Sequence, residues 1–482
     1  MPRAWRSGAR TAPAKPRHDR APRARRDRRR AGLAAAATAA ELGLEVALFD
    51  DQPAPGGQIY RGVEKTPLVD PAVLGEDYRR GDGLAEAFRA SGAAYHPSCG
   101  VWLLTPEREI GLLDNGRARF VTAGRAIIAG GAMERPVPFP GWTLPGVMTA
   151  GAGQILLKSA GIVPEKGVVL AGTGPLLLLL AAQYLRAGVR IAALLDMTPT
   201  ANTLRALPHL PAALSAFGTL AKGLALKREI RRAGVRVVKG VTSLRALGEA
   251  RLEAVVYEAG GREQRLDSEL LLVHFGVIPD SNTTRSLGVR HLWDSRQLCW
   301  RPAVDAWGNT DVEGFAVAGD GAGIGGALAA EQAGRLAALE AARALGRIEA
   351  AERDRRAAPA RAALAKELRV RPFLDALFQP APELISRLDD DTVVCRCEEV
   401  TAGQIREAVG QGCTGPNQLK SFTRCGMGPC QGRQCGTTVS QLIGHTLGRP
   451  VEEIGAYRIR PPLKPISLTQ LAALDGEGAA AA

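Results

Sequence analysis

Cysteine and long apolar runs are both scarce in this sequence. Only eight of its 482 residues are cysteine, and six of these lie between positions 395 and 435. No apolar run of 18 residues is free of polar, glycine or proline interruption, so we expect no transmembrane helix. No C-x-x-C or C-x4-C pair stands beside Gly57 or directly follows the loop at Gly174. This absence excludes the dithiol chemistry of thioredoxin and glutathione reductases.

The net positive charge is concentrated in the first thirty residues. These carry 11 Arg and one Lys against two Asp, which accounts for ten of the 13 net charges of the chain. The remaining sequence has no basic stripe interleaved with aromatic residues, which excludes a nucleic-acid partner. Residues 1–30 also contain few large apolar side chains. Burial cannot offset their entropy of folding, so we predict a disordered leader.

The residues after this leader match the second half of a dinucleotide-binding β-α-β unit. An alanine-rich helix begins at Ala31, and a strand over Leu44–Phe49 follows it. The strand ends at Asp50, in the position of the acid that binds a ribose in such folds.

The first half of this unit does not match. The glycines of a G-x-G-x-x-G loop would fall at positions where the chain has Asp27, Arg29 and Gly32, and the preceding residues 20–25 read Arg-Ala-Pro-Arg-Ala-Arg. That segment cannot form a buried parallel strand, and Arg29 would place a side chain where a pyrophosphate must touch bare backbone. We infer that residues 1–30 come from a shifted reading frame or a wrong start, and that the chain binds its first cofactor weakly or not at all.

Three later segments place glycines where backbone can lie against a flavin nucleotide. The first follows Asp50, the second follows a short apolar strand, and the third opens a helix over Ala327–Leu345. An ordinary glycine turn is the alternative for the first segment. Their order resembles that of two-dinucleotide flavoproteins, in which the aspartate of the third segment holds the ribityl or pyrophosphate side of FAD. The candidate FAD-binding residues are Gly32, Asp50, Gly56, Gly57, Gln58, Gly130, Gly131, Gly319 and Asp320.

A second dinucleotide fold is inserted between these segments. Residues 166–196 read as strand, turn, helix and strand, with the loop Gly172-x-Gly174-x-x-Leu177. Leucine replaces the third glycine, which allows close helix–strand packing, so nucleotide binding and a fold relic without a ligand both remain open. Asp196 ends the second strand and favours a ribose 2′-hydroxyl over a 2′-phosphate. The nucleotide expected here is NAD or another adenine nucleotide.

The cysteines near the C-terminus follow the pattern C-x-C-x32-C-x4-C. Cys395, Cys397, Cys430 and Cys435 form two close pairs, and thiolates in this arrangement bind iron–sulfur clusters or zinc. A disulfide is the simplest alternative, but no secretory segment is visible and reducing cytosol disfavours it. Zinc usually takes C-x2–4-C pairs, which a C-x-C pair matches poorly. The pattern therefore favours an iron–sulfur cluster.

Short helices are expected around these cysteines. The residues Thr401-Ala-Gly-Gln404 have the form of a capping box. We predict helices over residues 402–409, from Pro416 to Arg424, and after Cys435. A domain of about sixty residues has little core of its own, so the cluster would stabilise it.

The segments CRCEEVT and NQLKSFTRCGMGPCQGRQC resemble the [2Fe–2S] domain of the bacterioferritin-associated-ferredoxin type. The resemblance implies that the cluster ligands are Cys395, Cys397, Cys430 and Cys435. It leaves Cys413 and Cys425 as packing residues.

The segments GGQIYR, PFPGWTLPGVMTAGAGQ, AGTGPLLLL and VAGDGAGIGG resemble the α (A) subunits of hetero-oligomeric flavin-dependent dehydrogenases. These include opine oxidases, hydroxyproline and proline dehydrogenases, and hydrogen cyanide synthase. The resemblance implies FAD, a β subunit like D-amino-acid oxidase with its own flavin, a small third subunit, and a quinone or another electron carrier as acceptor. It also implies a cytoplasmic location or a peripheral one at the inner membrane face.

The sequence therefore predicts an α/β flavoprotein with two nested Rossmann-like dinucleotide-binding domains, followed by a small all-α [2Fe–2S] domain. The expected divisions are a leader (1–30), the FAD domain in two parts (31–160 and 281–346), the nested nucleotide domain (161–280), a helical linker (347–390), the cluster domain (391–450) and a tail (451–482).

The expected activity is electron transfer within a multi-subunit dehydrogenase that oxidises an amino acid, an imino acid or an opine. No general base or clamp for a substrate carboxylate is recognisable, so no catalytic residue is assigned, and His274 is interpreted as a satisfied core residue. Two alternatives remain. One is a self-sufficient NAD(P)H-dependent reductase, and the other is an iron–sulfur module with a vestigial flavoprotein body.

Overall fold

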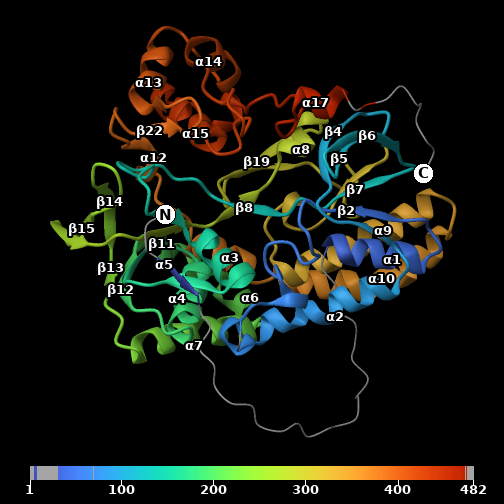
Figure 1. Ribbon diagram of the computed structural model, residues 1–482, viewed down its shortest axis with the longest axis horizontal. Helices are drawn as coiled ribbons and strands as arrows, with labels where there is room; N and C mark the ends of the chain where they lie inside the picture. Colours follow the sequence, from blue (N-terminus) through green and yellow to red (C-terminus); the bar gives the residue numbers. More distant parts are fainter. Residues whose placement is uncertain (1–4, 8–30, 69, 473, 475–482) are drawn as a thin grey trace, which may run out of the picture.

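The computed structural model describes residues 5–7, 31–68, 70–472 and 474. Figure 1 shows a broad α/β body with a separate helical part above it, formed by the C-terminal segment in orange and red. Of the first thirty residues only Trp5–Ser7 are described, as β1, which pairs antiparallel with β10 (Ile162–Pro164). The predicted disorder of the other leader residues lies outside the described part. None of the described helices combines the length and the apolar character that a bilayer crossing requires.

A parallel five-stranded sheet has the strand order β13-β12-β11-β17-β9, and four of its strands belong to the predicted nested nucleotide domain. Its strands are β9 (Val147–Thr149), β11 (Val168–Thr173), β12 (Ile191–Asp196), β13 (Val237–Lys239) and β17 (Leu271–Phe275). Every residue of β11 is buried. A strand covered on both faces needs apolar residues at successive positions, which explains its unbroken hydrophobic run.

Different layers cover the two faces of this sheet. On one face, Leu180 and Tyr184 of α4 (Pro175–Arg186) share a core cluster with Leu170. On the other face, Tyr257 shares a cluster with Val169. Tyr257 belongs to an antiparallel sheet of β14 (Val241–Leu247), β15 (Ala254–Ala259) and β16 (Arg262–Asp267).

The parallel strands of the predicted FAD domain form two separate pairs. Strand β2 (Ala47–Phe49) pairs with β3 (Ala94–His96), and β7 (Ala126–Ile128) pairs with β21 (Phe315–Val317). Within the described residues, no strand joins the two pairs. The predicted strand over Leu44–Phe49 is three residues shorter at its start, because only the residues opposite β3 have a strand partner.

Helix α1 (Ala31–Glu41) packs closely against α9 (Ala327–Ala344). A Cβ atom at Gly334 would lie 2.2 Å from the carbonyl oxygen of Ala31, so only glycine allows this approach.

Helix α10 (Ala350–Leu368) begins ten residues before the predicted helix over 360–369 and continues through Pro359. Arg353 and Arg361, on opposite sides of this proline, both stack 4.1 Å from the ring of Trp307. The stabilisation from these tertiary contacts offsets the loss of the one backbone hydrogen bond that proline, which has no N–H, cannot make.

The C-terminal part consists of short helices around a small core. Its elements are α12 (Glu383–Ser386), β22 (Val393–Cys395), β23 (Val400–Thr401), α13 (Ala402–Gly410), α14 (Pro416–Thr423), α15 (Gly436–Leu447) and α16 (Val451–Ile454). The three predicted helices are confirmed, with ends that differ by about one residue. The predicted capping box is also confirmed, because Thr401 and Gln404 cap each other's backbone.

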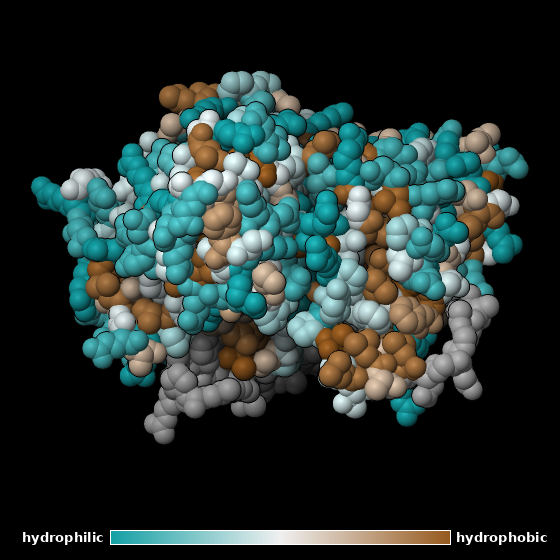
Figure 2. All heavy atoms as spheres, turned by 90° about the horizontal axis from the view of Figure 1, so that it is seen from above, coloured by the Kyte–Doolittle hydropathy of each residue, from teal (hydrophilic) through white to brown (hydrophobic). Residues whose placement is uncertain are grey.

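The other elements connect these parts. The strands are β4 (Gly100–Leu104), β5 (Glu109–Asp114), β6 (Arg117–Thr122), β8 (Ala132–Glu134), β18 (Val277–Pro279), β19 (His291–Asp294) and β20 (Cys299–Pro302). The helices are α2 (Glu76–Ala90), α3 (Ala150–Ala160), α5 (Ala201–Ala206), α6 (Leu210–Leu214), α7 (Phe217–Arg232), α8 (Asn282–Ser286), α11 (Arg371–Leu377) and α17 (Leu468–Ala472). The face in Figure 2 is mostly hydrophilic, with hydrophobic residues in small patches.

Candidate flavin, nucleotide and cysteine sites

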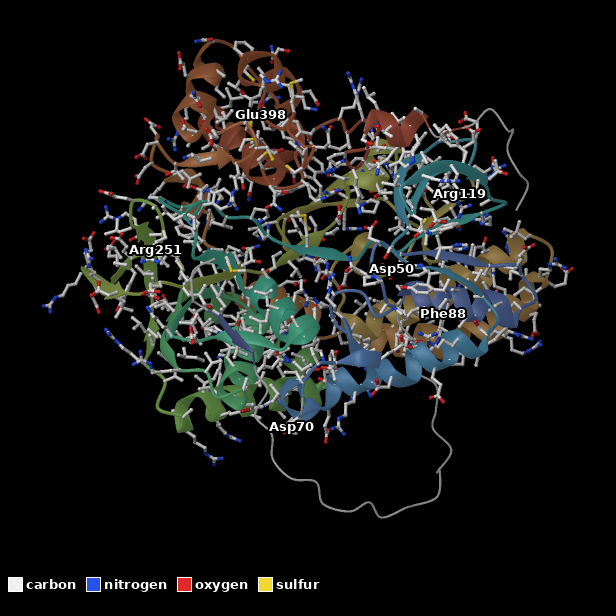
Figure 3. All side chains as sticks on the ribbon, in the orientation of Figure 1. Asp50, Asp70, Phe88, Arg119, Arg251 and Glu398 are labelled. Carbon is white, nitrogen blue, oxygen red and sulfur yellow. The ribbon has the colours of Figure 1, made fainter. Side chains whose placement is uncertain are left out.

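Most of the candidate FAD-binding residues line one continuous cavity of about 3070 Å³. Asp50 follows β2, and Asp320 precedes α9. Burial raises the pKa of Asp50, whose Oδ1 accepts the N–H of Gln52 (2.9 Å). The lining candidates are Gly32, Asp50, Gly56, Gly57, Gln58, Gly130, Gly131 and Asp320. The remaining candidate, Gly319, is adjacent to Asp320. Figure 3 labels Asp50 near the centre of the body.

Two of these positions need glycine or an acid for geometric reasons. Gly56 has φ +134°, and a Cβ atom there would lie 2.3 Å from the carbonyl oxygen of Tyr60. Asp320 Oδ1 accepts the N–H groups of Gly325 (2.9 Å) and Gly326 (2.8 Å), which turns the chain into α9. These residues therefore shape the cavity wall itself, and both hydrogen bonds of Asp320 use the same carboxylate oxygen, Oδ1.

FAD, which the fold implies, fits only part of this cavity. Asp50, the predicted ribose acid, and the glycine segments predicted to face the flavin line it. The predicted defect at Asp27 and Arg29 lies outside the described residues, and the described helix α1 begins at Ala31 with Gly32 as its one fingerprint glycine. The described residues therefore fit the two ends of FAD but do not include a glycine loop for its pyrophosphate.

The nested domain brings its candidate nucleotide residues to one edge of the sheet. Gly172 lies opposite both Asp196 and His274 in the strand register. A Cβ atom at Gly172, where φ is +127°, would lie 1.9 Å from the carbonyl oxygen of His274. Gly174 then leads into α4, so the loop and Asp196, the predicted ribose acid, meet at the carboxyl ends of adjacent strands, as in nucleotide-binding folds.

A hydrogen-bonded pair, the buried His274 and the partly buried Glu134, lies beside this loop. His274 Nδ1 lies 2.7 Å from Glu134 Oε1, and the N–H of Gly151 donates to Glu134 Oε2 (2.7 Å). The interpretation of His274 as a satisfied core residue agrees with its burial and with this bond. Sequence reasoning missed Glu134, which follows the Gly130-Gly131 pair by three residues.

Three cysteine sulfurs converge in the C-terminal part. Cys395, Cys425 and Cys435 are buried, and their Sγ atoms all lie within 4.8 Å of one another. Hydrogen bonds from Cys425 and Cys435 lower the pKa of Cys395 to about 2, and the N–H of Gly426 also donates to its Sγ (3.4 Å). This geometry suits a metal centre, because a cation would hold several thiolates at once.

Cys397 and Cys430 form a second pair on the more exposed side of the same loops. Their thiols are hydrogen-bonded to each other. Burial raises the pKa of Cys397, and the neighbouring Cys430 and Cys395 raise it further. The structure therefore distributes the four predicted ligands between the trio and this pair. It also brings Cys425, which sequence reasoning left as a packing residue, into ligand distance. Figure 3 shows the sulfur atoms near Glu398.

The other cysteines have packing environments. Cys413 is fully buried, and its thiol donates to the carbonyl oxygen of Gly415 (3.4 Å). Cys99 and Cys299 are buried in the body, each with 1% of its surface exposed.

Tyr457 is a site residue that sequence reasoning missed. The glycines at 426 and 432 face its ring, and a Cβ atom at either would lie 2.6 Å from a ring carbon. Burial raises the pKa of the Tyr457 hydroxyl. The glycines predicted around the cysteines therefore make room for an aromatic ring as well as for tight turns.

Hydrogen bonds connect the cysteine loops to the flavoprotein body. The Asn282 side chain donates to the carbonyl oxygens of Cys430 (3.4 Å) and Gln431 (3.2 Å). Trp142 Nε1 donates to the carbonyl oxygen of Val393 (2.7 Å). Cys397 also lines the cavity that contains Gly57 and Asp320. Residues of the two candidate cofactor sites therefore line one common cavity.

Comparison with known proteins is consistent with this arrangement. Residues 30–344 match the family model described as pyridine nucleotide-disulphide oxidoreductase, and residues 390–475 match the sarcosine oxidase A3 domain. The fold is similar to that of L-proline dehydrogenase from P. horikoshii, with a TM-score of 0.65 at 16% identity over 92% of this chain and 77% of that chain.

Sequence relatives extend over nearly the whole chain. The A subunit of opine oxidase from Rhizobium meliloti is 42% identical over 92% of this chain and 86% of its own length. Hydrogen cyanide synthase subunit HcnB of Pseudomonas aeruginosa is 34% identical over 93% of this chain and 97% of its own length. The chain therefore belongs to the family of opine oxidase A subunits, which are flavin-dependent oxidoreductases, and it is one component of a multi-subunit flavin dehydrogenase.

Proposed function

We propose that this chain is the electron-transferring subunit of a dehydrogenase that oxidises an amino acid, an imino acid or an opine. A β subunit resembling D-amino-acid oxidase would oxidise the substrate. This chain would then pass the electrons, one at a time, to a quinone or another carrier. The observation that supports this most directly is the cavity shared by the flavin-side residues Gly57 and Asp320 and by Cys397.

The proposed cluster ligands are Cys395, Cys397, Cys430 and Cys435. A [2Fe–2S] cluster would supply a one-electron acceptor, and its potential depends on hydrogen bonds to the sulfurs and on solvent exposure. The N–H of Gly426 donates to Cys395 Sγ, and Asn282 fixes the backbone at Cys430. These residues orient the thiolates and hold them at a constant position beside the flavin cavity.

The proposed FAD-binding residues would each contact a different part of the cofactor. Asp50 would accept hydrogen bonds from the adenosine ribose, and Asp320 would contact the ribityl chain through its second carboxylate oxygen. The glycines at 56, 57, 130 and 131 would let the backbone approach the flavin closely. In the nested domain, Gly172, Gly174 and Asp196 would hold NAD or another adenine nucleotide.

The test is co-expression of this chain with its proposed β subunit. We expect the complex to reduce a dye acceptor with at least one amino acid, imino acid or opine. We also expect the chain alone to be inactive with the same substrates. Visible and EPR spectra of the complex should show both flavin and a [2Fe–2S] centre. A complex with both cofactors that oxidises none of these substrates would contradict the proposed substrate class.

A self-sufficient NAD(P)H-dependent reductase is the second candidate. The first two fingerprint glycines, Gly172 and Gly174, and Asp196 at the strand end favour it. Rapid bleaching of the flavin by NADH in the absence of any partner chain would support this alternative over the proposed relay.

A further inference from the structure

We propose that Tyr457 raises the reduction potential of the proposed [2Fe–2S] cluster, because its hydroxyl donates a hydrogen bond to a sulfur of the bound cluster. The inference deepens the proposed function and rests on its cluster, but not on FAD, on the nested nucleotide domain or on the substrate.

Tyr457 is held in the cysteine site from both sides of its own backbone. It follows α16 in a segment without regular secondary structure. Ser440 of α15 donates to the carbonyl oxygen of Gly455 (2.7 Å), and Lys420 of α14 donates to that of Arg458 (3.1 Å). The Lys420 Nζ atom also lies 4.8 Å from the centre of the Tyr457 ring. Two helices therefore fix the position from which this side chain projects.

Three glycines of the cysteine loops surround the Tyr457 ring. A Cβ atom at Gly426 or Gly432 would lie 2.6 Å from a ring carbon, and one at Gly436 would lie 3.2 Å from the ring. Gly436 directly follows Cys435 in the sequence. Because these residues lack side chains, the ring lies directly against the backbone that carries the cysteines.

The ring places its hydroxyl beside the three converging sulfurs. Tyr457 is 4% exposed and shares a core cluster with Cys395, Cys425 and Cys435. Burial raises the pKa of its hydroxyl, and the neighbouring Cys435 and Cys425 raise it further. A phenolic hydroxyl is protonated at neutral pH and can donate one hydrogen bond.

This hydroxyl makes no geometrically complete hydrogen bond among the described residues, although Cys425 is close enough to interact with it. Leaving a buried donor unsatisfied costs about 1–3 kcal/mol. A cluster held by Cys435 would supply the acceptor that the hydroxyl lacks, because its sulfurs carry negative charge. The donor set fits this role, since the N–H of Gly426 already donates to another sulfur, Cys395 Sγ (3.4 Å).

A hydrogen bond to a cluster sulfur favours the reduced form. Reduction adds one negative charge to the cluster, so a donor stabilises the reduced form more than the oxidised form and raises the potential. The Tyr457 hydroxyl would thereby make the cluster a better acceptor for electrons from the flavin.

The test measures the midpoint potential of the cluster in the full-length chain after anaerobic reconstitution. Tyr457→Phe removes the hydroxyl and keeps the ring between its glycines. Tyr184→Phe is the matched control, because the Tyr184 hydroxyl is also buried without a partner among the described residues but belongs to α4 of the nested domain. A redox titration followed by EPR gives the ratio of reduced to oxidised cluster at each potential.

We expect this ratio at a fixed potential to fall about tenfold in Tyr457→Phe, which corresponds to a midpoint about 59 mV lower for a one-electron couple. The cluster content, measured by visible absorption, should stay the same, because the ligand thiols are unchanged. Tyr184→Phe should keep the midpoint of the unchanged chain. An unchanged or higher midpoint in Tyr457→Phe, or an equal decrease in both variants, would overturn the inference. Loss of cluster without a change in midpoint would overturn it as well, because the role of Tyr457 would then be structural.

Failure of this inference can be distinguished from failure of the proposed function. If the unchanged chain forms no [2Fe–2S] EPR signal, the proposed relay and this inference both fail. If the cluster forms and the complex with a β subunit reduces a dye acceptor, but Tyr457→Phe has the midpoint of the unchanged chain, only this inference fails.

Discussion

Cys397 and Cys425 distinguish two ligand sets for the cysteine site. The sequence pattern assigns Cys397 and Cys430 beside Cys395 and Cys435, whereas the closest sulfur trio contains Cys425. We expect Cys397→Ser to abolish the visible absorption and the reduced-state EPR signal of the cluster. Cys425→Ser should retain both, because only the ligand thiolates bind iron. Spectra after anaerobic reconstitution would measure this difference.

Cys413→Ser is the matched control for these variants. Cys413 is fully buried in the same part of the chain, but its thiol bonds to the carbonyl oxygen of Gly415 rather than to another cysteine. Its substitution should leave the spectrum unchanged. Loss of the signal in Cys425→Ser together with its survival in Cys397→Ser would assign Cys425 to the ligand set in place of Cys397.

The Glu134–His274 couple supports a second prediction at this scale. Glu134→Ala removes the acceptor for both His274 Nδ1 and the N–H of Gly151. Each buried donor left unsatisfied costs about 1–3 kcal/mol, so for two donors we expect the free energy of unfolding to fall by roughly 2–6 kcal/mol. Urea titration followed by circular dichroism would measure it.

An exposed ion pair offers the control for Glu134. Glu263 pairs with Arg245 on the surface of the β14–β16 sheet. Glu263→Ala should cost no more than about 1 kcal/mol, because exposed pairs are screened by water and salt. Equal losses for Glu134→Ala and Glu263→Ala would show that the buried couple contributes no particular stability.

Some contacts between single residues could not be predicted from the sequence. The cysteine spacing located four candidate ligands, because their pairing is local in the chain. Cys425 meets Cys395 only because Arg424 ends α14 in the left-handed conformation (φ +61°) and turns the chain back. Glu134 and His274 are 140 residues apart. No local pattern specifies contacts of that kind.

The loop between β11 and α4 gives a prediction at the scale of elements. Gly172→Ala would place a Cβ atom against the carbonyl oxygen of His274 at a positive φ. The loop must therefore shift, and we expect adenine-nucleotide binding at the nested domain to weaken at least tenfold, or about 1.4 kcal/mol. Isothermal titration with NAD and ADP would measure the affinity.

Helix α7 contains the matching glycine for comparison. Gly223 lies inside α7, and a Cβ atom there would meet no atom within 4 Å. Gly223→Ala should stabilise the protein by up to about 1 kcal/mol and leave nucleotide affinity unchanged, because alanine is the better helix former. Unchanged affinity in Gly172→Ala would show that the loop does not bind the nucleotide.

Elements were predictable where their signals are local. The capping box at Thr401 and the helices near the cysteines follow from short-range sequence features, and the structure confirms them. Helix α10 was predicted too short, because the stacking of Arg353 and Arg361 on Trp307 is a long-range contact. Strand β2 was predicted too long, because strand length depends on the partner beside it, and only β3 is present among the described strands.

At the scale of the whole molecule, the contact between the C-terminal part and the body sets the position of the cysteine site relative to the proposed flavin site. It includes four side-chain hydrogen bonds to backbone carbonyl oxygens across the boundary, two from Asn282 and one each from Trp142 and Thr438. Each such bond contributes about 1 kcal/mol. Together they hold the cysteine loops against the body, and Figure 1 shows the helical part above this body.

Loosening this contact should slow electron transfer without affecting the cluster itself. We expect the double variant Trp142→Phe and Asn282→Ala to keep the cluster spectrum but to reduce the dye acceptor several-fold more slowly in the complex with a β subunit. It should also be cut faster by protease between residues 379 and 391, because the two parts separate more often. Asn417→Ala, which removes bonds within the C-terminal part only, should leave both rates unchanged. An unchanged dye-reduction rate in the double variant, with cleavage accelerated, would show that electrons leave the flavin without passing through the cysteine site.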